Sequence, residues 1–565
     1  MKRILLVEPD YCNKFPPIGL MKIATYHKMR GDYVEFYKGL APFQTIAKMD
    51  RVYVTSTFTF FFDTTVETIL HYTRYIDKNS IFIGGIAVTL LADEFKAKTG
   101  VENVISGQLH DSSKLGYDDL INIDMLPLDY DILDDIEYEY NIDDNFFAYT
   151  TRGCKRGCAF CAVNTLEPCY FETNNIVEQV SYVRNNFGDK RNLMLMDNNT
   201  LFSEELEKIC TEIISLGFVK DDANYIQENP AEIFFSKIDR RISRNNSTWI
   251  VTDKFILFFK KFISRVKKES LQQSLTNIID EIDDSDYPLG VLLKHKEIIT
   301  EVVEKYRAKK PLQRYVDFNQ GIDARLVTNE NMRILSQLPL KPLRLAYDNT
   351  TMTSAYINAF RIAYDFGIRH FSNYMLYNYD DSPDDFWQRV NTNVLLYNEF
   401  DDVSAFSFPM KYAPVDKTNR AYIGVYWNKK YLSALNVILN VTKGVIAKEH
   451  DFFERAYGRT PGEFQEILSM PNEFIKYRDL FDEIGFIDLW KSEYRKLSVK
   501  EQVLLIRSLS GEDVEFDNAH ILSFYKITKH QVETQKVSVL SYQLKSENER
   551  EAAKSITIKP VASLA

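Results

Sequence analysis

Short apolar runs alternate with helix-like segments over much of this chain, and this alternation limits the folds that it can adopt. Within residues 1–115, the runs RILLV, YVEFY, RVYVTST, IFIGG and VENVIS have the length and composition of strands. Segments such as GLMKIATYHKMRG and TTVETILHYTRYI between them have helical spacing. Helical crossovers join parallel strands, so we expect an α/β fold, with a doubly wound, Rossmann-like domain over residues 1–115.

A second array of the same kind covers residues 147–412. Its strand-like runs include NLMLMDNN, RYVDFNQG, LRLAYDN, HFSNYMLYN and VSAFSFPM. The array predicts a partial (β/α) barrel of the TIM type. Polar residues follow its strands, and they are Asp197, Asn198, Asn319, Gln320, Asp348, Asn349 and Asn378. Ligands of parallel β/α folds meet the carboxyl ends of the strands, so we expect a ligand site there.

The rest of the chain differs from these two arrays. Residues 116–146 are acidic and read as an ordered surface linker, and residues 220–310 read as an irregular insertion. One helix face in the insertion is marked by Phe255, Phe258, Phe259, Phe262, Ile263 and Val266. Residues 413–535 read as helical, and residues 536–565 as a polar tail. Expected packing residues of the helical region are Trp427, Phe452, Phe453 and Tyr457.

Charge limits the partners that this chain can have. The net charge of −11 means that contact with a nucleic acid needs a local basic patch. Residues 237–268 supply one, with ten Lys and Arg against two Asp. Such runs are more often solvated helix faces, so both interpretations of this segment stay open.

Hydropathy predicts a protein of the cytoplasm that does not enter a membrane. No run of eighteen apolar residues occurs, and the start MKRILLVEPD is too short in apolar residues for a secretory signal. Thiols stay reduced in the cytoplasm. Clustered cysteines there favour a metal site or catalysis over disulfides.

The sequence TTRGCKRGCAFCAV holds three of the six cysteines, namely Cys154, Cys158 and Cys161. Thiolates are soft ligands that suit zinc and iron–sulfur clusters. Structural zinc requires four ligands, and no second Cys or His pair supplies the fourth. Three thiolates instead leave one iron of a [4Fe–4S] cluster open. The remaining cysteines are scattered, so we expect one cluster.

This spacing, together with Phe160 before the third cysteine, resembles the radical S-adenosylmethionine (SAM) superfamily. The resemblance implies a [4Fe–4S] cluster on the three cysteines, SAM on the open iron, and Phe160 near the adenine. It also implies that SAM is cleaved reductively to a 5′-deoxyadenosyl radical, which abstracts hydrogen from a substrate. The electron would come from a donor such as flavodoxin or ferredoxin.

The resemblance extends over roughly residues 1–410. The blocks PPIGLMKIATYHKMRGDYVEF and IFIGGIAV are similar to the cobalamin-binding-type domain of the class B-like branch, as are VENVISGQ and LPLDYDIL. The DxHxxG loop, whose His ligates cobalt, is absent, and His27 lies within a helix pattern. Some members of the branch bind cobalamin without that His. Bulky side chains at Phe58, Phe60, Phe61 and Phe62 would fill the corrin cleft, and we therefore expect no cobalamin.

The resemblance also implies roles for residues at two strand ends. Asp197, Asn198 and Asn199 occupy the position that accepts hydrogen bonds from the SAM amino group, and a carboxylate such as Asp197 suits an ammonium. The alternative is helix capping by Asn199 or Ser203.

The second strand end carries Gln320, Asp323 and Arg325. The resemblance implies that these side chains contact the SAM ribose and carboxylate, and a guanidinium is a good carboxylate partner. The alternative for Arg325 is an ion pair with Asp323. Gly321 is expected to allow a tight turn.

The sequence therefore predicts the first of three functions, and the other two stay open as alternatives. The first is radical SAM chemistry on an unidentified substrate. The second is a cobalamin-dependent radical SAM methyltransferase. The third is a cluster-bearing protein that binds or senses nucleic acid.

Overall fold

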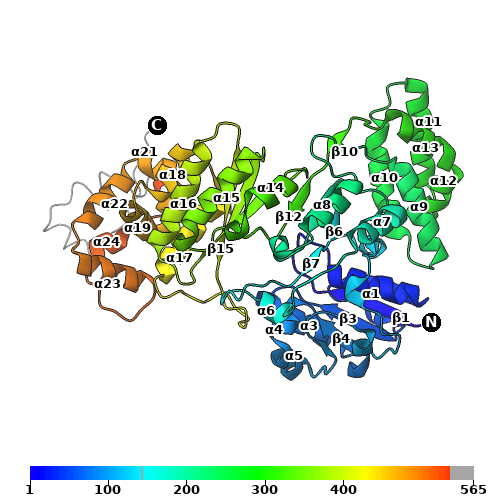
Figure 1. Ribbon diagram of the computed structural model, residues 1–565, viewed down its shortest axis with the longest axis horizontal. Helices are drawn as coiled ribbons and strands as arrows, with labels where there is room; N and C mark the ends of the chain where they lie inside the picture. The colour runs from blue at the N-terminus through cyan, green and yellow to red at the C-terminus, as the bar shows by residue number, and fades with distance from the viewer. Residues whose placement is uncertain (142–143, 535–565) are drawn as a thin grey trace. The chain divides into compact units, whose positions relative to one another are not determined.

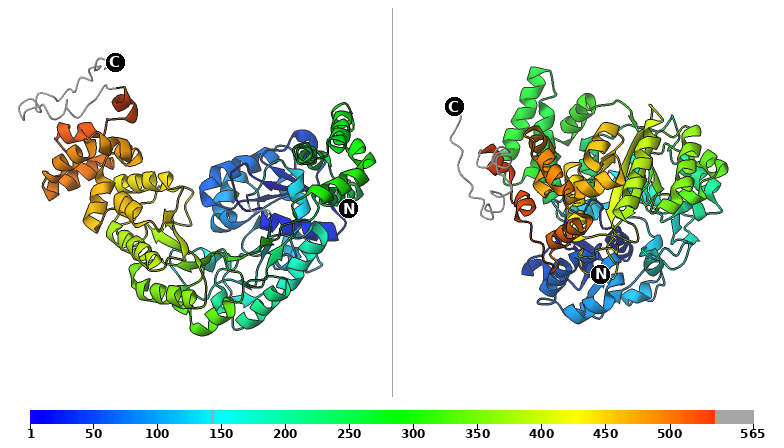
Figure 2. Two further views of the ribbon diagram at one scale, coloured as in Figure 1. Left: turned by 90° about the horizontal axis from the view of Figure 1, so that it is seen from above. Right: turned by 90° about the vertical axis from the view of Figure 1, so that its left-hand side faces the viewer.

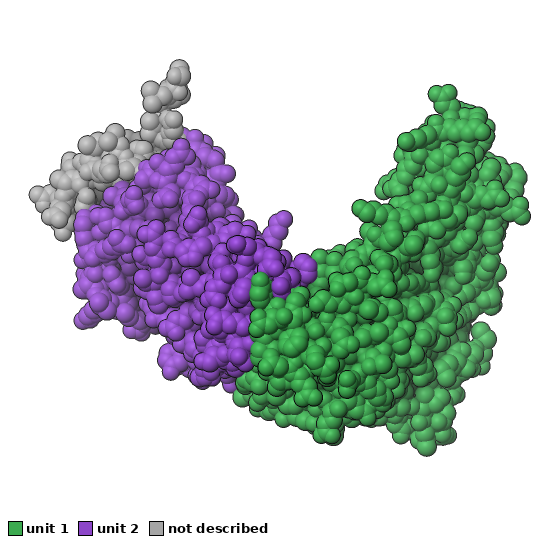
Figure 3. All heavy atoms as spheres, turned by 45° about the horizontal axis from the view of Figure 1, so that its top comes forward, with its two compact units in different colours: residues 1–344, 362–368, 414–420 green, residues 345–361, 369–413, 421–565 purple. Residues whose placement is uncertain are grey.

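The structure is a computed structural model that describes residues 1–141 and 144–534. Its chain divides into two compact units, which Figure 3 colours separately. The first unit contains residues 1–344, 362–368 and 414–420. The second contains residues 345–361, 369–413 and 421–565.

A five-stranded parallel sheet opens the first unit, as the sequence predicts. The sheet has the order β2-β1-β3-β4-β5, so the chain winds outward in both directions from β1. Its strands are β1 (Arg3–Glu8), β2 (Tyr33–Lys38), β3 (Arg51–Thr55), β4 (Ile81–Gly84) and β5 (Val104–Ile105).

Helices cover this sheet on both faces (Figures 1 and 2). Helix α3 (Phe62–Tyr72) and helix α5 (Ala92–Thr99) share one core with the side chains of Val52 and Val54. Neighbouring residues of a strand point to opposite faces. Tyr53, which bonds His27 of α1 (Ile18–Met29), therefore places α1 on the other face.

A three-stranded parallel sheet follows, with the order β12-β9-β6. Its strands are β6 (Asn145–Ala148), β9 (Asn192–Leu195) and β12 (Val316–Phe318). Helix α7 (Ile176–Phe187) precedes β9, and helix α8 (Leu206–Ser215) follows it. Because the strands are parallel, their carboxyl ends meet at one edge of the sheet.

The insertion is a small helical bundle, so the expectation of an irregular segment is wrong. Phe234 and Phe255 stack at 4.0 Å within its own core, and the predicted apolar face at Phe255, Phe259 and Phe262 is buried. A two-residue antiparallel pairing of β10 (Asn224–Tyr225) with β11 (Leu312–Gln313) joins its two ends. The helices, green in Figure 1, are α9 (Pro230–Ser243), α10 (Trp249–Ile263), α11 (Glu269–Asp283), α12 (Pro288–Lys294) and α13 (Lys296–Tyr306).

The acidic linker pairs with the basic insertion. Arg241 of α9 forms an ion pair with Asp135, and Lys237 lies 2.9 Å from Asp134. Asp131 faces Arg244 at 3.2 Å and is only 2% exposed. The linker is therefore partly buried rather than a surface segment, and much of the positive charge of α9 is neutralised within the chain.

A four-stranded sheet has the order β13-β14-β15-β16. Strands β14 (His370–Tyr377) and β15 (Ser404–Lys411) are parallel, and β16 (Ile446–Ala447) is antiparallel to β15. Strand β13 (Leu343–Ala346) forms one edge, and helices α15 (Thr353–Asp365) and α16 (Pro383–Asn398) connect the strands. The structure thus confirms a mixed α/β protein with parallel sheets. A single barrel built from both sheets stays a prediction.

The C-terminal region is helical, as predicted. Trp427, Phe453 and Tyr457 are buried, but Phe452 is 40% exposed, so its assignment as a packing residue is wrong. The predicted tail at 536–565 lies outside the described residues. The helices are α17 (Lys429–Val441), α18 (His450–Tyr457), α19 (Pro461–Ser469), α20 (Asn472–Lys476), α21 (Arg478–Glu483), α22 (Phe486–Arg495), α23 (Val499–Leu509), α24 (Ala519–Phe524) and α25 (Lys529–Glu533).

None of the helices in the described ranges combines the length and the apolar character needed to span a membrane.

Candidate functional site

The three clustered cysteines lie in the loop between β7 (Thr151–Arg152) and α6 (Val163–Leu166), just beyond the carboxyl end of β6. All three are partly exposed. The Cys161 amide donates to the Cys158 carbonyl at 3.0 Å, and the Arg156 amide donates to the Cys154 sulfur at 3.4 Å.

Three thiols in one accessible loop fit an iron–sulfur cluster by their chemistry. Within residues 1–141 and 144–534, no three His, Cys, Asp or Glu side chains form a group that would hold a metal ion.

Asp197 anchors the start of this loop. Its Oδ1 atom accepts hydrogen bonds from the hydroxyl groups of Thr150 and Thr151, at 2.6 and 2.7 Å. The Thr150 amide donates to both carboxylate oxygens, at 3.0 Å to Oδ1 and 3.2 Å to Oδ2. Burial raises the pKa of Asp197, although these hydrogen bonds oppose the shift. The contact with the SAM amino group stays a prediction, and Oδ2 is the less engaged oxygen.

Glu167 holds the next two residues of the loop, a role that no local sequence pattern indicates. Its Oε1 atom accepts from Nη2 of Arg152 at 2.6 Å, and its Oε2 atom accepts from the Gly153 amide at 2.6 Å. Asn198 donates to Oε2 at 2.8 Å. Gly153 has φ +73°, and a Cβ there would lie 2.3 Å from the Cys169 carbonyl oxygen, so this turn requires glycine.

Asp323 brings the end of β12 to the cysteine loop. Arg156 of the loop forms an ion pair with its carboxylate, and Nε of Arg325 donates to Oδ1 at 2.7 Å. Burial raises the pKa of Asp323, but hydrogen bonds from Arg325 and Arg156 outweigh it and hold the pKa below its ordinary value. The structure thus shows the alternative that the sequence offered for Arg325, and a contact of Arg325 with SAM stays a prediction.

Three further residues of the predicted site are Gln320, Gly321 and Phe160. Gln320 is exposed beyond the end of β12, and Gly321 has φ +88°, as the expected tight turn requires. Phe160 lies half-buried between the second and third cysteines.

Asn199 is buried beside Asp197 without an evident structural partner for its amide oxygen. It is 5% exposed, and its Oδ1 atom has no hydrogen-bond donor among the described residues. Although Asn199 precedes the short 3-10 helix Thr200–Phe202, its side chain makes no capping bond, so that alternative is wrong for Asn199. Ser203 instead accepts from the Glu205 amide at 3.0 Å, ahead of α8. Buried polar atoms seldom stay unpaired, so Asn199 is a group that a bound molecule would satisfy.

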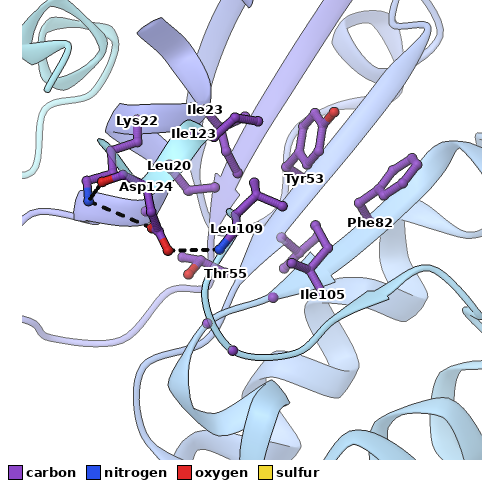
Figure 4. Close-up of a pocket in the computed structure, with 15 residues that line it drawn as sticks. Leu20, Lys22, Ile23, Tyr53, Thr55, Phe82, Ile105, Leu109, Ile123 and Asp124 are labelled. Atoms are coloured by element: carbon purple, nitrogen blue, oxygen red, sulfur yellow. Dashed lines mark hydrogen bonds and ion pairs between the residues drawn. The ribbon is translucent and has the colours of Figure 1, made fainter. Parts of the chain in front are cut away.

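A separate pocket of about 120 Å³ lies at the carboxyl edge of the five-stranded sheet (Figure 4). Thr55, Gly84 and Ile105 line it at the ends of β3, β4 and β5. At its rim, Nζ of Lys22 donates to the Asp124 carbonyl at 2.5 Å and lies 3.7 Å from its carboxylate (Figure 4). Burial lowers the pKa of Lys22 to about 8, and Asp124 opposes this shift.

The N-terminal domain offers no cobalt ligand at its one candidate. Nδ1 of His27 bonds Asp32 and Nε2 bonds the Tyr53 hydroxyl, each at 2.9 Å, so both ring nitrogens are engaged inside the fold. Burial lowers the pKa of His27 to about 4. Tyr11, after β1, stacks on Phe61, after β3, at 4.6 Å, and the carboxyl ends of these two strands are where such sheets bind ligands.

Phe58 and Phe62, which the sequence also placed in the corrin cleft, differ in their surroundings. Phe62 is an ordinary core residue, and Phe58 is 39% exposed.

Comparison with known families finds no family model that matches the chain, and comparison with curated proteins finds no match.

Proposed function

We propose that this protein is a radical SAM enzyme, which uses a [4Fe–4S] cluster to cleave SAM reductively and to abstract hydrogen from a substrate. The observation that carries the proposal is the Cys-x3-Cys-x2-Cys loop at the carboxyl edge of a parallel sheet. Asp197 and Asp323, from the two neighbouring strand ends, both contact residues of this loop or of its start. This matches the edge at which β/α folds bind ligands.

Each side chain at this edge has a specific task in the proposal. The thiolates of Cys154, Cys158 and Cys161 hold the cluster, which when bound supplies one-electron reduction of SAM. Phe160 packs against the adenine, and Asn199 accepts a hydrogen bond from the SAM amino group. The same proposal assigns the first sheet to a Rossmann-like domain and residues 147–412 to a partial barrel.

Production of 5′-deoxyadenosine tests the proposal. Anaerobically reconstituted protein is mixed with SAM and dithionite, and the product is measured by mass spectrometry. We expect the wild-type protein and a Cys12→Ala control to form 5′-deoxyadenosine, and a Cys158→Ala variant to form none. Equal product from Cys158→Ala and the control, or none from the wild-type protein, would refute the proposal.

The two alternative functions have less support. A cobalamin-dependent methyltransferase would need a corrin site, and the engaged His27 and the Tyr11–Phe61 stack do not favour one. A nucleic-acid binding role relied on the basic insertion, where Arg241, Arg244 and Lys237 pair with acids of the linker.

A further inference from the structure

We infer that Glu167 is a positioning residue that fixes the backbone from which Cys154 reaches the cluster. This inference rests on the proposed function. The resemblance to the radical SAM superfamily assigns no role to Glu167.

The carboxylate of Glu167 accepts hydrogen bonds from three residues, which lie at two places in the chain. Nε and Nη2 of Arg152 donate to Oε1 at 3.0 and 2.6 Å. The Gly153 amide donates to Oε2 at 2.6 Å, and Asn198 donates to the same atom at 2.8 Å. One side chain beyond the third cysteine therefore ties the residues before the first cysteine to the end of β9.

Loss of the Glu167 carboxylate would be energetically unfavourable, because it would leave the buried charge of Arg152 without its partner. The Arg152 side chain is only 9% exposed, and its guanidinium lies 4.1 Å from the ring centre of Tyr149. The ammonium of Lys22 lies 4.8 Å from the same ring. Two cations thus share this neighbourhood, and Glu167 supplies the carboxylate that Arg152 contacts. A buried charge that loses its partner is strongly unfavourable, so Arg152 would have to move without Glu167.

Three carboxylates act on successive parts of the loop. Asp197 fixes Thr150 and Thr151, Glu167 fixes Arg152 and Gly153, and Asp323 holds Arg156. Cys154 lies between the second and third of these anchors. Loss of Glu167 would free the backbone next to Cys154 while the Asp197 anchor stays in place. Partners that orient metal ligands in this way commonly change metal affinity when they are replaced.

The test compares Glu167→Gln with Glu178→Gln, a matched change at an exposed position of α7. Glutamine keeps the shape of the side chain but loses the charge and one acceptor oxygen. In the protein without iron, we expect faster amide hydrogen exchange in the peptide that contains Gly153. In the reconstituted protein, we expect a chelator to remove iron about tenfold faster than from the control.

Each outcome decides one question. If Glu167→Gln matches Glu178→Gln in both exchange and iron release, the inference is overturned. If the wild-type protein binds no iron, the proposed function fails, and exchange at Gly153 alone decides whether Glu167 holds the loop. If Glu167→Gln does not fold, Asn198→Ala replaces it, because this change removes one donor to the same carboxylate. Asn198→Ala should then accelerate exchange at Gly153 relative to Glu178→Gln, and unchanged exchange would overturn the inference.

Discussion

The carboxylate of Asp197 holds the two residues at the start of the cysteine loop, Thr150 and Thr151. It is 2% exposed, and its oxygens accept from the hydroxyls and amides of Thr150 and Thr151. The loop before the cysteines is therefore ordered by one buried side chain from the neighbouring strand. The contribution of Asp197 to the free energy of unfolding can be measured in the protein without a cofactor.

Replacing Asp197 by Asn should destabilise the protein by about 1–3 kcal/mol, because an amide group would face donors that now share a carboxylate. The free energy of unfolding, from urea titration of the protein without iron, measures this. Asp253→Asn, at an exposed position of α10, is the control. Equal stabilities of the two variants would show that Asp197 does not anchor the loop.

The sequence predicts this part of the site only in outline. It places Asp197, Asn198 and the cysteine loop at strand ends, because strand ends follow from apolar periodicity. It does not identify Glu167, because the contacts to Arg152 and Gly153 exist only after the chain closes on itself. The ion pair between Arg325 and Asp323 can be predicted from the sequence, because the two residues lie close together in the chain. The ion pair between Arg156 and Asp323 joins residues that are 167 positions apart, and no local pattern predicts it.

At the scale of elements, the strands were the most predictable part and the insertion the least. Five apolar runs of residues 1–115 are the five strands of the first sheet, since buried parallel strands require such runs. Within the insertion, the apolar face at Phe255, Phe259 and Phe262 indicates a helix where α10 lies, whereas the sequence does not predict the other four helices of the bundle. The ion pairs of the insertion with the linker join segments about a hundred residues apart, and local sequence cannot show these pairs.

Helix α17 contains a lysine that should make stability depend on pH. Nζ of Lys430 donates to the carbonyl oxygens of Leu468 and Met470, at 2.8 and 2.7 Å. Burial lowers its pKa from 10.5 to about 7. Between these values the unfolded chain keeps a proton that the folded chain has released, so the free energy of unfolding rises with pH.

Wild-type protein should therefore gain stability relative to Lys430→Met between pH 7.5 and pH 9.5, by up to about 1.4 kcal/mol for each pH unit. Urea titrations of both proteins at the two pH values measure the difference, and other titrating groups cancel in the comparison. A constant difference across this range would show that Lys430 stays charged in the folded protein.

At the scale of the whole molecule, the first unit holds the residues that the proposal assigns to the cluster, while the proposed partial barrel of residues 147–412 continues into the second unit. The first unit carries the five-stranded sheet with its pocket, the cysteine loop and the anchors Asp197, Glu167 and Asp323. The second unit contributes a parallel strand pair and the C-terminal helices. Substitutions within the first unit are therefore enough to test the proposed cluster site in the full-length protein.

The N-terminal domain should retain no corrinoid. Its candidate ligand His27 is engaged on both nitrogens, and Tyr11 stacks on Phe61 beyond the carboxyl ends of β1 and β3. Reconstituted protein is incubated with hydroxocobalamin or methylcobalamin and desalted, and its absorbance is recorded. We expect the spectrum of the protein alone. Stoichiometric retention of either corrinoid would support the methyltransferase alternative instead.

Iron and sulfide content after anaerobic reconstitution tests the central claim most directly. The wild-type protein should bind about four irons per chain, as one [4Fe–4S] cluster requires, and should turn brown. A variant with Ala at Cys154, Cys158 and Cys161 should bind none. A second variant, with Ala at Cys12, Cys169 and Cys210, controls for cysteines elsewhere and should match the wild-type protein. If the first variant retained the iron and sulfide of the wild-type protein, the cysteine loop would not be the cluster site.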